Sequence, residues 1–226
     1  MPQLRLGSIA PDFEADTTEG PIKFHEWAGN SWVMLFSHPG DFTPVCTTEL
    51  ADISQRLPDF VKRDVKVIGI SADSLQTHFE WIEDIIEIAS KTAPTCVEYP
   101  IIADTERKVS LLYDMLDHQD MTNVDEEGLP YTIRTIFLID PNKVIRSLLQ
   151  YPASVGRDFD EVIRLIDAIQ VADKHKVMTP VCWKPGDDVI IPPGTPDEEA
   201  KKQFPEHTTC PKLAYMRTAP MKDLEH

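Results

Sequence analysis

The chain is poor in several features that define whole classes of protein. Its 226 residues include four cysteines, too few for a disulfide scaffold, and no two of them form a Cys-x-x-Cys pair. Sparse cysteine is typical of a reducing compartment, where a special thiol is reactive rather than structural. The missing Cys-x-x-Cys pair argues against a dithiol oxidoreductase.

Positive charge and long apolar runs are also scarce. Lys and Arg number 22 against 38 Asp and Glu, a formal net charge of −16, so nucleic-acid partners are not expected. The longest apolar runs, such as 32–36, suit a buried strand and are too short to span a bilayer. Residues 1–6 lack a signal or transit pattern, so we expect a cytoplasmic protein, and 224–226 resemble a purification-tag remnant.

The residues that are present suit a globular α/β fold. Hydrophobic residues make up 42% of the chain, and its length favours one domain with a smaller appendage. Apolar periodicity predicts strands at 22–24, 32–36, 65–70, 132–139 and 144–150, and helices at 47–62, 74–89, 106–113 and 158–174. Because strands and helices alternate before a final hairpin and helix, we expect a mixed sheet covered by helices.

Two of these helices carry more detailed predictions. Asp73 and Ser74 are suited to cap the second helix. Its buried face should consist of the apolar residues Phe79, Ile82, Ile85, Ile86 and Ala89. Pro58 falls inside the first helix and should kink or interrupt it, because proline lacks the N–H group that a helical hydrogen bond needs.

The chain changes character after Lys176 and becomes rich in proline. One strand is expected at 188–191 and one helix at 196–204, with Thr195 as its cap. We expect this piece to lack a core of its own and to pack on the main domain or on a second subunit.

The segment 38–49 lies where a buried strand passes into a helix. Cys46 falls in the first helical turn, where backbone N–H groups and the helix dipole favour an anion, so a thiol there is stabilised as the thiolate. Thr43 can direct a hydroxyl to the same place, and Pro39 stiffens the loop. Arg134, on a later strand, is the best candidate for a cationic partner.

These residues resemble the active-site pattern of the peroxiredoxin family, Pro-x-x-x-Thr-x-x-Cys, read here from Pro39 to Cys46. Arg134 falls where the family has a further active-site arginine. Longer strings are similar to the 1-Cys subgroup: 36–39, 41–50, 151–153, 156–161 and 179–181. They agree in order and spacing, and the resemblance runs from about residue 6 to residue 204.

The resemblance implies a thioredoxin-like fold with a small C-terminal peroxiredoxin extension. Residues 4–168 would form the peroxidase domain, and 169–223 a C-terminal domain that takes part in a homodimer. In such a sheet the strand with Arg134 lies beside the strand that leads to Cys46.

The implied activity is thiol-dependent reduction of hydrogen peroxide and organic hydroperoxides, in antioxidant defence and redox homeostasis. The thiolate would attack a peroxide oxygen and become a sulfenic acid, which an external thiol of the glutathione or thioredoxin system reduces. No metal or other cofactor is implied. The residues carried over are Cys46, Thr43, Arg134 and Pro39 as catalytic, and His38, Glu49 and Arg157 as pocket residues.

Other residues leave alternatives open. Cys182 lies in a string that resembles a shortened resolving-cysteine motif of 2-Cys peroxiredoxins, so it could resolve the sulfenic acid. Cys96 reads as a passive thiol. His207 and Cys210 have a metal-ligand spacing without a second pair. The structural alternatives for the central residues are an inert buried cysteine at Cys46, a strand-surface ion pair for Arg134 and a half-buried, satisfied His38.

Two other activities are also considered. Some 1-Cys peroxiredoxins carry a lipase-like Gly-x-Ser-x-Gly site, and Ser31 with His25 partly matches it. The last glycine of the string is absent, and the family's acid position falls on Asn142, near Asp140, so the pair lacks a clear orienting acid. A holdase chaperone built from an acidic oligomer is the other alternative.

Overall fold

The computed structural model describes residues 4–221 and divides the chain into two compact units, with the boundary between Phe159 and Asp160 in the sequence. The predicted boundary after residue 168 remains a prediction. The suspected tag remnant at 224–226 lies outside the described residues. Over the described range, no helix is long and apolar enough to cross a membrane.

The first unit is built on a mixed seven-stranded sheet with the order β2-β1-β5-β4-β3-β6-β7. The three inner strands β3, β4 and β5 are parallel, and the remaining pairings are antiparallel. The predicted mixed sheet is therefore confirmed. Its strands are β1 (Glu14–Thr17), β2 (Gly20–Lys23), β3 (Trp32–Ser37), β4 (Val65–Ser71), β5 (Ile101–Ala103), β6 (Arg134–Ile139) and β7 (Ile145–Tyr151).

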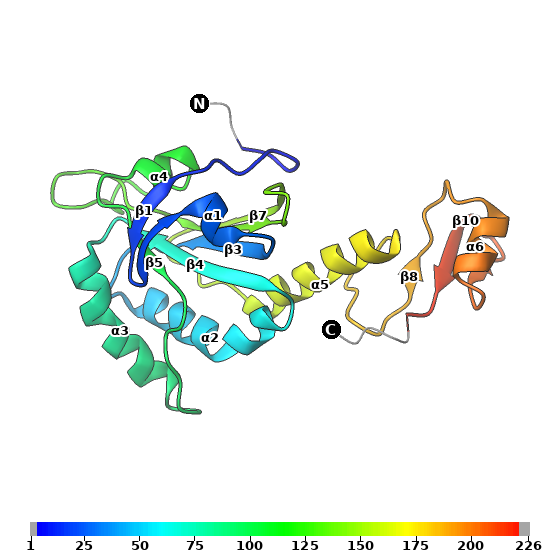
Figure 1. Ribbon diagram of the computed structural model, residues 1–226, viewed down its shortest axis with the longest axis horizontal. Coiled ribbons are helices and arrows are strands. Elements are labelled where there is room, and N and C mark those ends of the chain that lie inside the picture. The colour runs from blue at the N-terminus through cyan, green and yellow to red at the C-terminus, as the bar shows by residue number, and fades with distance from the viewer. Residues whose placement is uncertain (1–3, 222–226) are drawn as a thin grey trace. The chain divides into compact units, whose positions relative to one another are not determined.

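Helices cover both faces of this sheet (Figure 1). The long helices α2 (Pro44–Val61) and α3 (Leu75–Ala89) lie together on one face, and the short helices α1 (Phe24–Ala28) and α4 (Lys108–Leu112) lie on the other. Because both faces are covered, the inner strands read as nearly continuous apolar runs rather than alternating ones. The strand and helix that surround 38–49 are thus anchored in the core, which fixes the ends of that loop.

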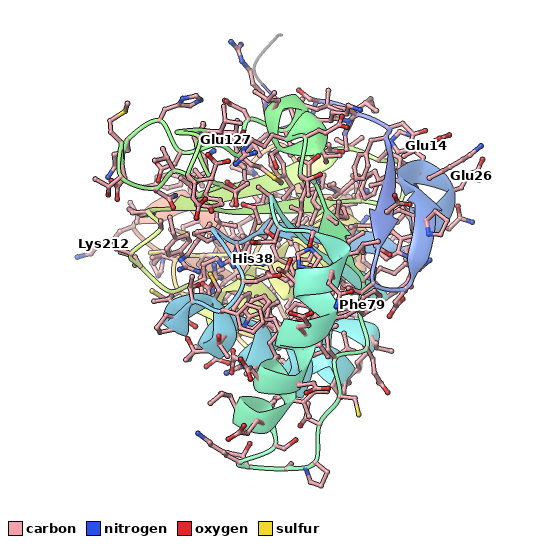
Figure 2. The ribbon with its side chains drawn as sticks, turned by 90° about the vertical axis from the view of Figure 1, so that its left-hand side faces the viewer. Glu14, Glu26, His38, Phe79, Glu127 and Lys212 are labelled. Carbon is pink, nitrogen blue, oxygen red and sulfur yellow. The ribbon has the colours of Figure 1, made fainter. Side chains whose placement is uncertain are left out.

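Helix α3 begins as predicted, and its buried face agrees with the prediction at Ile85 and Ala89 but not at Phe79. The Ser74 hydroxyl caps it by accepting from the Thr77 amide. Its buried residues are His78, Trp81, Ile85 and Ala89. The predicted Phe79 lies outside this stripe and is 50% exposed (Figure 2). The stripe includes the two polar aromatic rings because each finds a hydrogen-bond partner in the interior, which removes most of the penalty for burying them.

The sequence predicted that Pro58 would kink or interrupt α2, and it does not interrupt the helix. The helix runs on to Val61 and ends there. Proline removes one helical hydrogen bond, and near the C-terminal end that loss affects only the last turn. The first strand pair also differs from the prediction, since β1 was missed and Phe24 begins α1 instead of ending a strand.

The second unit has more structure than its composition indicates. It contains a small core of eight buried residues: Ala168, Val171, Val177, Trp183, Val189, Ile191, Ala200 and Ala219. A three-stranded sheet has the order β8-β10-β9. The prediction that this piece lacks a core of its own was therefore wrong. Its elements are most of α5 (Phe159–His175), then β8 (Val189–Ile190), α6 (Asp197–Gln203), β9 (Thr208–Cys210) and β10 (Leu213–Ala219).

Thr195 does not cap α6, and the turn before the helix is held instead by a buried arginine, Arg217. Pro196 holds the N-cap position, and the Thr195 carbonyl instead accepts from Arg217 Nη2 at 2.7 Å. The same guanidinium binds the Pro192 carbonyl at 3.0 Å and Asp197 Oδ1 at 3.0 Å. Arg217 of β10 thus stabilises the turn that precedes α6. No local sequence pattern predicts these contacts.

Candidate active site

Cys46 lies in the first turn of α2, as predicted. Thr43 is the N-cap residue in an extended conformation (φ −107°, ψ 142°), and Pro44 follows as the first helical residue. Thr47 N donates to the Thr43 carbonyl at 3.0 Å, the first helical hydrogen bond, so the Cys46 amide precedes the hydrogen-bonded part of the helix. The Cys46 side chain is fully buried. A sulfur there meets the positive end of the helix in a site shielded from bulk water.

The loop before the helix is held in a specific shape. Phe42 has a left-handed backbone (φ 53°), an uncommon conformation for a residue with a side chain. The Thr43 hydroxyl donates to the Gly40 carbonyl at 2.9 Å, so its oxygen retains lone pairs that can accept from a ligand. Pro39 is buried where the loop leaves β3.

Arg134 is the cationic partner of the sulfur. It begins β6, which pairs with β3, as the resemblance implied. Its Nη1 lies 3.4 Å from Cys46 Sγ and 2.6 Å from Glu49 Oε2, and its Nε donates to the Ala153 carbonyl at 2.8 Å. The guanidinium is therefore held on two sides and directs one N–H at the sulfur. It is no strand-surface ion pair, because its side chain is buried.

Arg157 completes a buried cluster of three charges. Its backbone N and Nε both donate to Glu49 Oε1, at 2.8 Å and 2.9 Å, and its Nη2 donates to Oε2 at 2.7 Å. Its Nη1 binds the carbonyls of Ser37 and Thr135. One carboxylate thus balances one of two arginines. The remaining positive charge lies beside the Cys46 sulfur.

The two arginines also set the charge of Glu49. Burial raises the pKa of this carboxyl, but the charge and hydrogen bonds of Arg157, with a smaller contribution from Arg134, more than offset the burial and leave the pKa below 4.5. Glu49 is therefore ionised at neutral pH. Three of the predicted residues, Glu49, Arg134 and Arg157, meet in one network, although they are far apart in the sequence.

His38 belongs to a neighbouring buried cluster that sequence reasoning missed. Its Nε2 lies 3.0 Å from Asp41 Oδ1, and the other Asp41 oxygen lies 2.6 Å from His78 Nδ1 of α3. All three side chains are buried. The His38 carbonyl accepts from Thr132 Oγ1 at 2.7 Å. His78 lies on the buried face of α3, where the other residues are mainly apolar. Its polarity on that face was the one signal in the sequence that could have identified it.

The predicted ester-hydrolase residues are not assembled. Ser31 Oγ donates to Asp64 Oδ1 at 2.8 Å, and His25 Nε2 binds the Ala10 carbonyl at 2.8 Å. An imidazole that donates this N–H to a carbonyl does not use that nitrogen as a base toward a serine. Asp140 accepts instead from the backbone of Asn142, at 2.9 Å, within its own turn.

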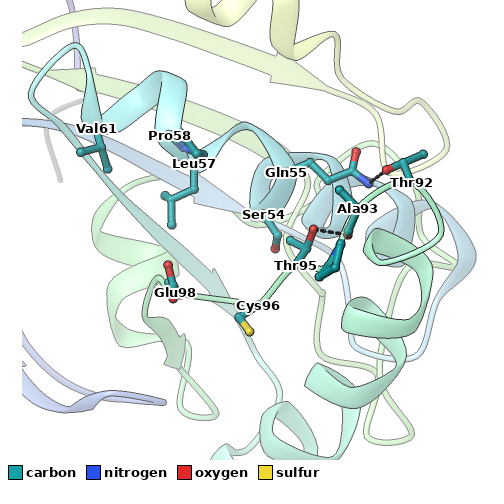
Figure 3. A pocket seen from close by; sticks show the side chains of 11 residues that line it. Ser54, Gln55, Leu57, Pro58, Val61, Thr92, Ala93, Thr95, Cys96 and Glu98 are labelled. Carbon is teal, nitrogen blue, oxygen red and sulfur yellow. Dashed lines mark hydrogen bonds between the residues drawn. The ribbon is translucent and has the colours of Figure 1, made fainter.

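The remaining cysteines lie elsewhere. Cys96 is exposed at the edge of a surface pocket of about 610 Å³ between the C-terminal half of α2 and the segment after α3 (Figure 3). Gln55 lines the same pocket and binds Thr92. Cys182 is exposed in the second unit with a left-handed backbone (φ 56°). Its predicted resolving role stays a prediction.

Among the described residues, one group of side chains has a geometry that could hold a metal ion. His38, Asp41 and Asp73 bring one ligand atom each within 4.8 Å of one another. The His207 and Cys210 pair does not belong to such a group in the part of the chain that is described.

Comparison with known proteins agrees with this geometry. Residues 6–148 match the AhpC/TSA family, and 168–207 match the C-terminal domain of 1-Cys peroxiredoxin. Mitochondrial peroxiredoxin PRX1 of Saccharomyces cerevisiae is 50% identical over 204 residues, which are 90% of this chain and 77% of that protein.

Two solved structures are similar over nearly the whole chain. A cysteine mutant of peroxiredoxin 6 of Arenicola marina has a TM-score of 0.90 at 42% identity, covering 98% of this chain and 100% of its own. A yeast mitochondrial 1-Cys peroxiredoxin has a TM-score of 0.86 at 47% identity, covering 97% and 100%. That structure addresses thiol resolution via the glutathione/thioredoxin systems. The chain therefore belongs to the AhpC/TSA family as a 1-Cys peroxiredoxin with a thioredoxin-like fold, and it is a thiol-dependent peroxidase.

Proposed function

We propose that Cys46 is the thiol that attacks the peroxide. The observation that carries this proposal is the Arg134 Nη1–Cys46 Sγ contact of 3.4 Å in the first turn of a helix. The thiolate sulfur displaces the far peroxide oxygen as the O–O bond breaks and an S–O bond forms. The sulfur becomes a sulfenic acid, and the departing oxygen takes a proton and leaves as water or an alcohol.

The surrounding residues divide the remaining work. Thr43 Oγ1, whose own proton is donated to Gly40, accepts the peroxide O–H. Arg134 and the helix-start amides stabilise the charge that develops on the departing oxygen. Glu49 and Arg157 hold Arg134 in place, and the buried Pro39 stiffens the loop. We assign His38 to the pocket wall.

We propose an external thiol as the reductant, drawn from the glutathione or thioredoxin system. The yeast relative is resolved via these systems. The reductant sulfur attacks the Cys46 sulfenic sulfur and displaces water, and a second thiol then releases Cys46 from the mixed disulfide. Cys182 is too exposed and too weakly matched to a resolving motif for us to assign it this step.

The reductant proposal predicts a persistent sulfenic acid. One equivalent of peroxide, followed by dimedone, should label Cys46 and leave Cys182 as a free thiol in mass spectra. With glutathione in place of dimedone, Cys46 should carry one glutathione. A dominant Cys46–Cys182 disulfide would instead make Cys182 the resolving residue, and a Cys182→Ser variant would then lose that species.

We propose that the protein forms a homodimer through its C-terminal unit. That unit exposes large apolar side chains: Met178, Val181, Leu213 and Tyr215. Exposed apolar groups of this kind are typical of interaction surfaces. Sedimentation at micromolar concentration should give a dimer both with and without dithiothreitol, which excludes a disulfide between exposed cysteines. A monomer under both conditions would contradict the proposal.

We also propose a reducing compartment as the site of action. The sequence features favour the cytoplasm, while the yeast relative is named as mitochondrial. Both compartments hold the thiol systems that the reaction needs. Fractionation of cells that express the tagged chain distinguishes them.

A further inference from the structure

The buried carboxylate of Asp41 bridges two imidazoles on different elements. Asp41 lies in the loop before α2, His38 at the end of β3 and His78 in the first turns of α3. His38 lies in the interior of the first unit (Figure 2). The backbone N of Asp41 also donates to Asp73 Oδ2 at 2.9 Å. The cluster thus ties the catalytic loop to the start of α3.

The hydrogen-bond partners of His78 determine its protonation state. Its Nδ1 lies 2.6 Å from an Asp41 carboxylate oxygen, and its Nε2 lies 3.2 Å from the Ile102 carbonyl oxygen. A carbonyl oxygen can only accept, and so can an ionised carboxylate. Burial raises the pKa of Asp41, but hydrogen bonds and charge from His38 and His78 more than offset it and keep the carboxyl ionised. Both His78 nitrogens must therefore donate, which makes the ring an imidazolium.

His38 differs from His78 in one decisive way. Its Nε2 donates to Asp41 at 3.0 Å, but its Nδ1 is buried and has no hydrogen-bond partner in the described protein. A proton on Nδ1 would be a buried donor without an acceptor, which costs free energy, and the His78 imidazolium already balances the Asp41 carboxylate. His38 is therefore neutral, and its Nδ1 carries a lone pair rather than a proton.

We propose that His78 is a positioning residue for the Cys46 reaction: its buried imidazolium, acting through Asp41, keeps His38 in the neutral form that presents Nδ1 as a hydrogen-bond acceptor. His38 directly precedes Pro39, in the loop that carries Thr43. Hydrogen peroxide brings two O–H protons, of which Thr43 Oγ1 accepts one. The second also needs an acceptor, and the neighbouring Arg134 supplies donors alone. The proposal rests on Cys46 as the reacting thiol.

The surroundings of the cluster contain one further carboxylate and several uncharged groups. Asp73 is the further charged group in contact with it, and its Oδ2 accepts from the Asp41 amide and from Ser71 Oγ. Trp81, whose ring centroid lies 5.1 Å from that of His38, and Thr132 contribute uncharged groups. Both Asp41 oxygens are already engaged by imidazoles, so the His38, Asp41 and Asp73 group is better balanced by the His78 cation than by a metal ion.

The first test is the wild-type imidazole nitrogen spectrum at neutral pH. Nitrogen-15 correlation spectra distinguish protonated from unprotonated ring nitrogens, and His38→Gln and His78→Gln variants assign the signals. Both His78 nitrogens should be protonated, while His38 should show a protonated Nε2 and an unprotonated Nδ1. An unprotonated nitrogen on His78, or a proton on His38 Nδ1, overturns the proposal. Recording the spectrum in Cys46→Ser makes this result independent of the assignment of Cys46.

The second test is the rate of peroxide reduction by His78→Gln. The amide can still donate to Asp41, but the positive charge is lost, so His38 should take up the proton. Nδ1 then becomes a donor, and the second-order rate with hydrogen peroxide should fall roughly tenfold. The rate of the variant relative to that of the wild type should recover as the pH is raised and His38 loses that proton.

A matched control separates positioning from general damage. His118→Gln changes an exposed histidine of the same unit and should leave the rate and its pH profile unchanged. A His78→Gln variant with a wild-type rate at every pH, or with a loss that no pH restores, overturns the proposed role. If the His78→Gln variant does not fold, the His38→Gln variant still assigns the His38 signals of the wild-type spectrum, and a proton on His38 Nδ1 there overturns the proposal.

Discussion

Replacing Cys46 with serine should abolish peroxide consumption while leaving the fold intact. A serine hydroxyl has nearly the size of the thiol but stays protonated at neutral pH, so Arg134 Nη1, 3.4 Å from the sulfur, would face a poor nucleophile. Loss of a nucleophile commonly lowers turnover by 10³-fold or more, on the order of what we expect here. The loss of activity is measured by following the consumption of hydrogen peroxide in a stopped-flow instrument, with dithiothreitol as the reductant.

Two control variants make that experiment specific. Cys96→Ser removes an exposed thiol at the edge of a remote pocket, and Ser31→Ala removes the hydroxyl that binds Asp64. Both should retain the wild-type rate. Substantial activity left in Cys46→Ser, or a comparable loss in Cys96→Ser, would move the chemistry away from Cys46.

Replacing Glu49 with glutamine should produce the largest loss of stability among single changes at the site. The substitution leaves Arg134 and Arg157 buried without a counter-charge, and removal of one partner from a buried ion pair costs about 3–5 kcal/mol. Urea denaturation at pH 7 measures this loss. Asp52→Asn is the matched control on the same helix, because its partly exposed pair with Arg56 should contribute about 1 kcal/mol or less.

The stabilisation by Glu49 should also depend on pH in a defined direction. The pKa of its carboxyl is lower in the folded protein than the ordinary 4.5, so the unfolded chain binds a proton first as the pH falls. The contribution is complete above about pH 4.5 and disappears as the pH falls through the folded value. The stability difference between wild type and Glu49→Gln should therefore shrink below pH 4.5. A difference that is constant from pH 7 to pH 4 would contradict this account.

Much of the site could be predicted because its signals are local. Thr43 and Cys46 lie in one short string between a strand and a helix, and the resemblance to the peroxiredoxin family implied that Arg134 lies beside them, as it does. The carboxylate bridge between His38 and His78 could not be predicted in the same way. The bridge joins a loop to a helix, and the positions of its residues in the sequence follow neither helical nor strand periodicity. It also depends on how α3 is rotated about its axis.

The C-terminal unit shows the opposite limit of sequence reasoning. Its proline content indicated irregular structure, yet β10 pairs with two strands and a buried Arg217 binds two carbonyl oxygens and a carboxylate. The exposed side chains of Leu213, Ala214 and Tyr215 do not alternate between apolar and polar. The strand pattern is hidden because a register shift separates Leu213 from Arg217.

The Arg157–Glu49 contact has a consequence for the order of events during synthesis of the chain. The two residues are separated by 108 positions, and their contact closes the charge network beside Cys46. Contacts between such distant residues form after local structure, because the intervening chain must first be synthesised and its ends brought together. Until then, Cys46 is a thiol without its cations. The charge network beside Cys46 is thus complete only after Arg157 has been synthesised and has reached Glu49.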